Sequence, residues 1–510
     1  MQASNRIIVN TVAQYVRTIL NMLLSLYSVR LIMGALGVEN YGIYSLVAGV
    51  VSLLSFFTNS LVGSTQRFLS YAQGRGEEKR LKSVFSNSLL LHLIIGLGVV
   101  IIFAAITPLL FNGFLNIAPE RLGAAKVVYL QVIAMVYISF VASPYRALLV
   151  SRENIVYTSA VDVMDGVLKV GLAILLTYVT FDKLIAYGWI MFFITSFNLL
   201  AFAIYCHAKY PECIFPRLKF FDKQYMKELM FYTGWKVYGS ASIALRNQGL
   251  AIVLNRRFGS AVNAAYGLGA QISGMVSFIS SSLQNAISPQ LTASEGAKDR
   301  TRMWFLANME NKFAFLLLAS IGIPTLFEMQ TLLEIWLKVV PKGAWLFGAT
   351  FLSMQITDMM TIGYGAANNA IGRRLGRYTA WTYTPKLLIL PFGWLLLHLG
   401  APLWTVCALM ILIEVGCMLI RVPLLRHEQG FRLRTFVVDV FLRSMPPVVI
   451  GATACVVLYL TIDASWRFLL TYALSCSLFL FTAYRFSLTA QERSKITSLF
   501  ASLKAKLHRR

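Results

Sequence analysis

The chain has 510 residues, of which 57% are hydrophobic and only 13% are charged, and its mean hydropathy is +0.66. Soluble domains carry about 25% charged residues, so this composition excludes a series of soluble domains and predicts an all-α polytopic membrane protein. The formal net charge of +24 is typical of basic cytoplasmic loops rather than of nucleic-acid binding, and no nucleic-acid partner is expected.

Apolar segments follow one another along the chain, and about twenty such residues cross the hydrocarbon core. The first segment follows a polar N-terminus without the features of a cleaved signal, so we expect it to be retained. The predicted spans lie near residues 8–34, 42–64, 84–110, 126–149, 156–181, 184–206, 229–254, 264–287, 311–333, 344–370, 378–398, 402–420, 445–462 and 467–484. These fourteen helices predict an N-terminal six-helix lobe over 1–228, a C-terminal six-helix lobe over 229–443, and two additional helices with a basic tail over 444–510.

The distribution of lysine and arginine predicts the orientation of these spans. If the N-terminus is cytoplasmic, the inner segments carry 32 of these residues and the outer loops carry seven. Positive residues concentrate on the cytoplasmic side of membrane proteins. One miscounted helix would move every later loop to the opposite side and would remove this strong asymmetry. Both termini are therefore expected in the cytoplasm.

No motif in the chain points to an enzyme. The loops are too short for a soluble catalytic domain, and no GxxxxGK[ST] phosphate-binding motif occurs. The six cysteines form no CxxC pair and lie mostly in apolar runs, so we expect free, buried thiols. The sequence predicts no catalytic residue, no cofactor and no metal ligand.

The segment that begins the chain is repeated 222 residues later. Identical pairs of the gapless alignment include Gly37/Gly259, Tyr44/Tyr266, Leu46/Leu268, Ala48/Ala270, Ser55/Ser277, Phe56/Phe278, Leu61/Leu283, Gly74/Gly296 and Arg80/Arg302. In both halves a short outer turn leads into the second helix, and its glycines suit a positive φ. Because an offset of six helices restores the orientation, we expect two lobes related by a parallel pseudo-twofold axis, with the transport path between them.

Ten charged residues inside the predicted spans are candidate site residues. The cations are Arg17, Arg30, Lys169, Lys236, Arg246 and Lys386, and the acids are Asp162, Asp165, Asp358 and Glu414. Each would cost about 2.5–3.5 kcal/mol at a lipid-facing helix centre, so we expect them to face a wet cavity, to pair, or to extend to a membrane surface. A surplus of cations favours an anionic cargo, phosphate above all.

Uncharged polar residues share helix faces with these charges. On the first span, Asn10, Gln14, Arg17 and Asn21 form one stripe at helical spacing. The predicted polar lining of the cavity consists of Asn10, Gln14, Asn21, Asn59, Asn247 and Gln355.

Structural roles compete with this interpretation at several positions. Arg30 and Lys386 lie where a long side chain would reach a membrane surface. Asp162 or Asp165 with Lys169 would form a structural ion pair, and the serine-rich stripes would serve as packing faces between helices.

Three stretches carry a family resemblance, namely VRLIMGALGVENYGIYSL (29–46), LLEIWLKVVPKGAW (332–345) and AANNAIGRRLGRY (366–378). They resemble the polysaccharide flippases of the multidrug/oligosaccharidyl-lipid/polysaccharide exporter superfamily. The resemblance extends over nearly the whole chain in helix number, loop lengths and the six-plus-six pattern, and members with fourteen helices are similar to this chain.

This resemblance implies alternating access by two lobes. It implies that an undecaprenyl-pyrophosphate-linked oligosaccharide moves from the cytoplasmic to the periplasmic leaflet of a bacterial inner membrane, for surface polysaccharide or lipopolysaccharide biosynthesis. The diphosphate is expected on some of the cations in the cavity, with the prenyl tail in lipid. Asp162, Asp165, Asp358 or Glu414 are candidates for exchange of H⁺ or Na⁺. Membrane lipids, a polysaccharide polymerase and other assembly proteins are candidate partners.

Other functions fit parts of the pattern. A cation-coupled multidrug exporter of the same superfamily would depend on Asp162 or Asp358. The related peptidoglycan-precursor flippases also combine a cationic cavity with two extra helices. A membrane glycosyltransferase or polysaccharide polymerase usually carries long outer loops with acidic or arginine motifs, which this sequence lacks, and a partner protein that has lost transport is the fourth alternative.

Overall fold

The computed structural model describes residues 3–52, 55–111, 117, 119–216, 221–258, 260–336, 340–464, 466–489 and 492–494. All regular elements in this part of the chain are helical. The reason is that a helix satisfies its backbone hydrogen bonds within one segment, which lipid requires of a spanning chain.

The long helices are α1 Ala3–Ser52, α2 Ser55–Gly74, α3 Glu78–Leu109, α4 Leu122–Ser151, α5 Ile155–Leu176, α6 Lys183–Lys209, α7 Lys223–Phe258, α8 Ser260–Gly296, α9 Arg300–Phe327, α11 Ala344–Met359, α13 Leu375–His398, α14 Leu403–Leu424, α16 Arg443–Thr461 and α17 Arg467–Thr482. The shorter elements are η2 Pro119–Arg121, α10 Met329–Trp336, α12 Ile362–Ile371, α15 Leu433–Thr435, η4 Phe436–Leu442 and η5 Ala483–Ser487.

The predicted membrane character of the fold is confirmed. Each of the fourteen predicted spans falls on a helix or on two consecutive helices of the described chain, and seven described helices are long and apolar enough to cross a membrane by themselves. Large apolar side chains such as Leu109, Ile204 and Leu460 are exposed, as a lipid environment requires. The protein is an all-α polytopic membrane protein.

The chain forms two compact units. Unit 1 consists of Met1–Ala241 and Asn285–Asp299, and unit 2 consists of Ser242–Gln284 and Arg300–Arg510. The division therefore passes through α7 and α8, and the helices α16 and α17 belong to unit 2.

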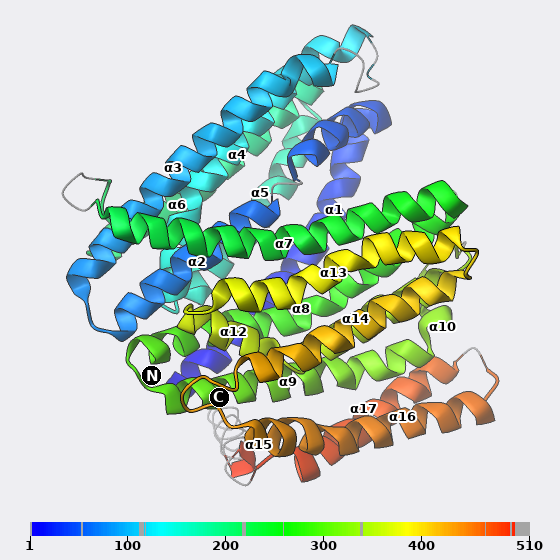
Figure 1. Cartoon of the computed structure of the whole chain (residues 1–510). Helices are drawn as coiled ribbons and strands as arrows, with labels where there is room; N and C mark the ends of the chain where they lie inside the picture. Colours follow the sequence, from blue (N-terminus) through cyan, green and yellow to red (C-terminus); the bar gives the residue numbers. More distant parts are fainter. Residues whose placement is uncertain are drawn as a thin grey trace, which may run out of the picture. The chain divides into compact units, whose positions relative to one another are not determined.

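In unit 1, α4 packs against α2, α3 and α6, and α1 packs along α5. Figure 1 shows α3 and α4 side by side, in the blue-to-cyan part of the chain. The apolar core includes Val128 and Val132 of α4, with Leu184 of α6. Since α1 carries Arg17 and α5 carries Asp162, Asp165 and Lys169, their contact brings predicted site residues together.

The expected turn between the first two spans is a kink within α1. Of the residues in this helix, Gly37 has a non-helical conformation, with φ 77° and ψ 163°. This positive φ agrees with the prediction that a glycine would occupy the turn, because glycine lacks the Cβ that disfavours such a conformation. Its predicted counterpart in the repeat, Gly259, lies outside the described residues.

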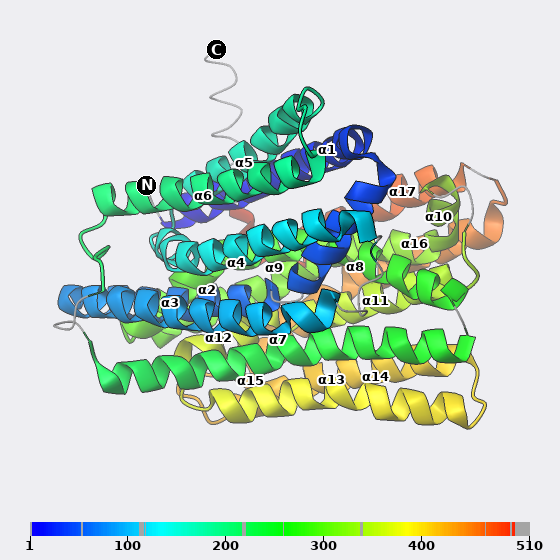
Figure 2. The ribbon, with the colours of Figure 1, turned by 90° about the horizontal axis from the view of Figure 1, so that it is seen from above.

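In unit 2, α9 packs against α11, α12, α16 and α17, and α13 packs along α14. Figure 2 shows the pair α13 and α14 side by side, in yellow. The core combines Leu250 of α7, Phe347 of α11 and Met410 of α14. Polar residues on α7, α11, α13 and α14 therefore meet within one unit.

Candidate functional site

In unit 1, Asp162 on α5 holds two arginines. Its Oδ2 atom lies 2.7 Å from Nη1 of Arg17 and 2.7 Å from Nη2 of Arg146, and its Oδ1 atom accepts a hydrogen bond from Nη1 of Arg146 at 3.0 Å. The bond from Arg146 is bidentate, the geometry in which guanidinium and carboxylate match best. Arg17 comes from α1 and Arg146 from α4, so one carboxylate links three helices.

One turn further along α5, Asp165 binds Lys169. The two charged atoms lie 2.7 Å apart, and Asp165 also accepts a hydrogen bond of 2.7 Å from Asn198 on α6. Asp165, Lys169 and Asn21 line a cavity of about 360 Å³. The Oδ1 atom of Asn21 is buried without a hydrogen-bond partner, so this cavity contains an unused acceptor beside an ion pair.

The other predicted residues of unit 1 lie apart from these pairs. Asn10 is buried and donates a hydrogen bond to the backbone carbonyl of Glu153 at 3.1 Å. Gln14 is buried and its Oε1 atom has no partner, whereas Asn59 is exposed. Lys236 is half-buried on α7. The side chain of Arg30 lies outside the described part of the structure.

In unit 2, five charged side chains form one network. The ammonium of Lys386 lies 2.5 Å from Glu414 and 3.7 Å from Asp358. Arg421 binds Asp358 at 2.7 Å, and Arg246 lies 3.8 Å from Glu414. Four of the five are buried; Asp358 is half-buried. The network joins α7, α11, α13 and α14.

All six predicted site residues that belong to unit 2 line one cavity of about 320 Å³. They are Arg246, Asn247, Gln355, Asp358, Lys386 and Glu414. The apolar remainder of the wall includes Phe351 and Met354 of α11. Lys386 is only 4% exposed, so the alternative that it extends to a membrane surface is wrong. The carboxylate of Glu414 keeps it inside.

Two arginines of these networks were missed by the sequence analysis. The count of basic residues places both Arg146, near the end of the predicted span 126–149, and Arg421, just after the span 402–420, on the cytoplasmic side, but they lie within α4 and α14. The apolar residues that follow them, ALLV at 147–150 and VPLL at 422–425, were the available signal that both arginines belong with the charges inside the spans. Moving the two arginines lowers the inner count from 32 to 30 residues against seven outside, which leaves the orientation argument unchanged.

The two networks share one electrostatic property. In unit 1, Arg17 and Arg146 bind Asp162 while Lys169 binds Asp165, and these two neighbouring groups on α5 are taken together as one network; in unit 2, Arg246, Lys386 and Arg421 face Asp358 and Glu414. Each network thus has three cations and two carboxylates. Pairing makes the charges tolerable in a medium of low dielectric, and the remaining positive charge makes each network attractive to an anion.

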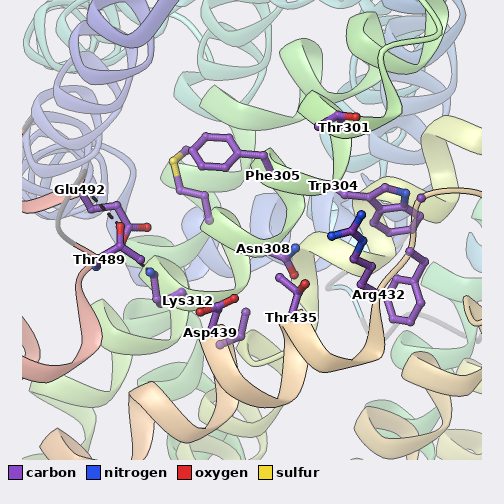
Figure 3. A pocket seen from close by; sticks show the side chains of 14 residues that line it. Thr301, Trp304, Phe305, Asn308, Lys312, Arg432, Thr435, Asp439, Thr489 and Glu492 are labelled. Carbon is purple, nitrogen blue, oxygen red and sulfur yellow. Dashed lines mark hydrogen bonds and ion pairs between the residues drawn. The ribbon is translucent and has the colours of Figure 1, made fainter.

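A third cavity, of about 670 Å³, lies elsewhere in unit 2 and contains none of the predicted residues. Figure 3 shows its lining from α9, η4 and the segment after α17, including Trp304, Asn308 and Arg432. At one side Lys312 binds Glu492 at 2.6 Å. This ion pair fixes the segment that follows α17 against α9.

Comparison with known proteins gives the family. The family model described as "Polysaccharide biosynthesis protein" matches residues 4–294. The uncharacterized membrane protein EpsK of Bacillus subtilis (strain 168) is 21% identical over 311 residues, which are 61% of this chain and 61% of EpsK. The chain therefore matches about three fifths of the length of this relative.

Solved structures share the fold. A MATE transporter, solved in the straight conformation, has a TM-score of 0.70 at 15% identity, over 82% of this chain and 94% of its own. A MOP superfamily transporter from Pyrococcus furiosus has a TM-score of 0.69 at 14% identity, over 82% and 94%. Identities this low show the fold alone. Because the family model covers more than half of the chain, the protein belongs to the polysaccharide biosynthesis protein family.

Proposed function

We propose that the protein is a flippase for an undecaprenyl-pyrophosphate-linked oligosaccharide, which it moves from the cytoplasmic to the periplasmic leaflet. The observation that supports this most directly is the cavity of about 320 Å³ inside unit 2, lined by Arg246 and Lys386. Its charge network includes one more cation than carboxylates. A positively charged site at membrane depth suits a negatively charged headgroup, and family membership suits polysaccharide assembly.

The diphosphate would bind by exchange of ion-pair partners. Arg246 holds Glu414 at 3.8 Å, a loose contact that leaves guanidinium donors for phosphate oxygens, which arginine binds in a forked geometry. In unit 1, Arg17 and Arg146 share one carboxylate, so one guanidinium can turn to a phosphate while Asp162 keeps the other. The sugars would occupy polar space and the prenyl tail would stay in lipid.

The carboxylates provide a way to couple transport to a cation. When a phosphate replaces Glu414 on Arg246 or Lys386, the released carboxylate is left in a buried site, where the neutral form or a bound cation is favoured. Asp162, Asp165, Asp358 and Glu414 are thus the candidate groups for H⁺ or Na⁺ exchange. We place the protein in a bacterial inner membrane with both termini in the cytoplasm, where it would work beside a polysaccharide polymerase.

The test uses a strain that lacks this protein, in which lipid-linked oligosaccharide is expected to accumulate on the inner leaflet. The wild-type chain should restore surface polysaccharide, whereas Arg17→Ala and Arg246→Ala should fail although they insert at normal levels. Arg426→Ala, at an exposed arginine outside the two networks, is the matched control. If both variants restore normal polysaccharide, the docking assignment is wrong.

A multidrug exporter is the second candidate, because the solved neighbours include MATE transporters. In that case Asp358 and Glu414, which line the cavity of unit 2, would bind an organic cation. Proteoliposomes that accumulate an organic cation, and lose this uptake in Asp358→Asn, would favour the exporter. A peptidoglycan-precursor flippase would instead rescue growth after depletion of the cell's own precursor flippase, which the proposed function does not predict.

A further inference from the structure

A cationic cavity lies in unit 2 where α13 begins, apart from the charge network described above. Its volume is about 280 Å³. It is lined by Asn368 of α12, by Arg374, Arg377, Tyr378 and Trp381 at the start of α13, by Ile420, Pro423 and Leu424 of α14, and by His427 and Glu428. The first turn of α13 directs free backbone N–H groups to this end of the helix, which favours an anion there.

The two arginines of this cavity are available to a ligand. Arg374 and Arg377 are exposed and form no ion pair within the described chain. The one acid in the lining, Glu428, is engaged by Arg300 at 3.5 Å. Excess positive charge therefore faces the cavity, and guanidinium groups one helical turn apart can bind phosphate oxygens together.

Two buried donors point to a ligand independently of the arginines. Asn368 and Tyr378 are both only 5% exposed. The side-chain nitrogen of Asn368 and the hydroxyl of Tyr378 make no hydrogen bond in the described structure. Buried polar groups are normally satisfied, so the unused donors of these two lining residues leave hydrogen-bonding capacity for an acceptor in the cavity.

The face of α13 that carries the arginines continues as an apolar stripe. Arg374, Arg377, Trp381, Leu388 and Phe392 lie within about 60° of one another around the helix, at 100° per residue. Trp381 is 55% exposed, Leu388 is 43% exposed and Phe392 is 49% exposed. Tryptophan favours the boundary between headgroups and hydrocarbon. Along this face the arginines come first, the tryptophan second and the apolar side chains last. The same order suits a phospholipid, in which the phosphate is followed by the glycerol and then by the acyl chains.

We propose that this cavity binds the phosphate headgroup of an anionic phospholipid from the surrounding membrane, with an acyl chain along the exposed stripe of α13. Arg374 and Arg377 hold the phosphate, Asn368 and Tyr378 donate to its oxygens, and Trp381 packs at the glycerol level. A soluble phosphate compound would use the cations but not the stripe, and for this reason we assign the site to a lipid. The proposal does not depend on which molecule the transporter carries.

The test compares lipid retention by the purified full-length protein, using native mass spectrometry with phosphatidylglycerol or phosphatidylethanolamine added. The wild-type chain should retain phosphatidylglycerol in preference. The double variant Arg374→Gln/Arg377→Gln should lose affinity for it by roughly thirty-fold, as expected for two basic residues at a membrane surface. Arg373→Gln is the matched control, because Arg373 is exposed beside Arg374 but does not line the cavity.

Three results would overturn the proposal. The first is equal retention of the two lipids by the wild-type chain, and the second is equal loss in the Arg373→Gln control. The third is displacement of phosphatidylglycerol by glycerol 3-phosphate or by a polyprenyl diphosphate at equal concentration, which would assign the cavity to a soluble anion or to the transported substrate. Since the substituted arginines are exposed, the melting temperature in detergent should stay at the wild-type value, and this separates lost binding from misfolding.

Discussion

Lys386 and Glu414 form an ion pair of 2.5 Å, and their side chains are only 6% and 4% exposed. The pair links α13 to α14 at the cavity of unit 2. A charge this deeply buried is tolerated because the opposite charge and further polar groups surround it. Glu414 also lies 3.8 Å from Arg246, and Lys386 lies 3.7 Å from Asp358, so each member of the pair has a second partner.

The first prediction concerns removal of one member of this pair. Lys386→Met should destabilise the protein by about 3–5 kcal/mol, because it leaves Glu414 buried with a single, more distant cation. Glu414→Gln should be destabilising for the corresponding reason. The double variant should cost less than the sum of the two single variants, since residues in contact are energetically coupled.

Denaturant unfolding in detergent of the four proteins in this cycle gives the coupling free energy. Additive effects of the two substitutions would show that the pair contributes nothing beyond its separate members.

The second prediction concerns Gly74 and Gly296, which are equivalent residues of the 222-residue repeat. A Cβ atom on Gly74 would overlap the carbonyl oxygen of Ala293, and a Cβ atom on Gly296 would overlap that of Tyr71. Tyr71 and Ala293 are also separated by 222 positions. The C-terminal ends of α2 and α8 therefore make two equivalent contacts in unit 1, in which the glycine of each helix lies against the backbone of the other. Gly74→Ala and Gly296→Ala should each destabilise the protein by about 1–3 kcal/mol through overpacking.

The matched control is Gly63→Ala, also on α2, where an added Cβ would meet no atom within 4 Å. This variant should keep or slightly raise the melting temperature, because alanine favours helix more than glycine does. Equal melting temperatures for all three variants would show that the close crossing is absent in solution.

The third prediction is a pH dependence at Glu492. Burial disfavours its ionised form, but hydrogen bonds from Lys312 and from the Thr489 backbone N–H outweigh this effect, so the pKa of Glu492 lies below its ordinary value. A carboxyl group with a lowered folded-state pKa stabilises the protein above its unfolded-state pKa. This contribution disappears as the pH falls through the folded-state pKa.

Glu492→Gln should therefore cost about 1.5–3 kcal/mol near pH 7, the usual range for a hydrogen bond to a charged group. The difference from wild type should shrink as the pH falls below the ordinary value of 4.5. Melting temperatures of both proteins from pH 7 to pH 4 provide the measurement, with Glu120→Gln at an exposed site as control. A difference that persists unchanged at pH 4 would contradict the assignment.

The fourth prediction concerns orientation. Lys79 at the start of α3 and Lys342 before α11 are both exposed, and the distribution of basic residues places them on opposite sides of the membrane. In intact spheroplasts, a membrane-impermeant maleimide should label Lys342→Cys and leave Lys79→Cys unlabelled until the membrane is opened. The wild-type chain, in which five of six cysteines are buried, sets the background. The reverse pattern would invert the proposed direction of transport.

Composition and periodicity were sufficient to predict the helices, because a chain in lipid has few alternatives to helix. Four of the five charged residues in the unit 2 network were also predictable, since Arg246, Asp358, Lys386 and Glu414 lie deep within apolar runs where charge is costly. Their pairing was not predictable, because it depends on which helices touch. Lys386 illustrates this: its position near Pro385 suggested a surface, and only its contact with α14 explains why it is buried.

The limits of the predicted spans caused the remaining errors. The predicted span 402–420 ends just before Arg421, although α14 continues to Leu424, and Arg146 lies near the inner end of the predicted span 126–149, where it counts as a cytoplasmic charge. In the same way Glu310 was left just before the span predicted at 311–333. It lies within α9, fully buried, and neither oxygen of its carboxyl group has a hydrogen-bond partner in the described structure. Hydropathy cannot detect a polar residue that other helices cover.

The position of α9 has a consequence for biosynthesis. In the most apolar stretch of α9, 72% of the residues are buried and the mean hydropathy is 1.2, whereas in that of α3 only 22% are buried and the mean hydropathy is 2.9. The helix also carries the buried polar residues Glu310 and Asn311. Two of the helices that cover it, α16 and α17, are synthesised more than a hundred residues later. We therefore expect the nascent chain to hold α9 at the translocon, or to leave it loosely inserted, until its C-terminal neighbours arrive. Truncation before α16 should then expose α9 to membrane proteases.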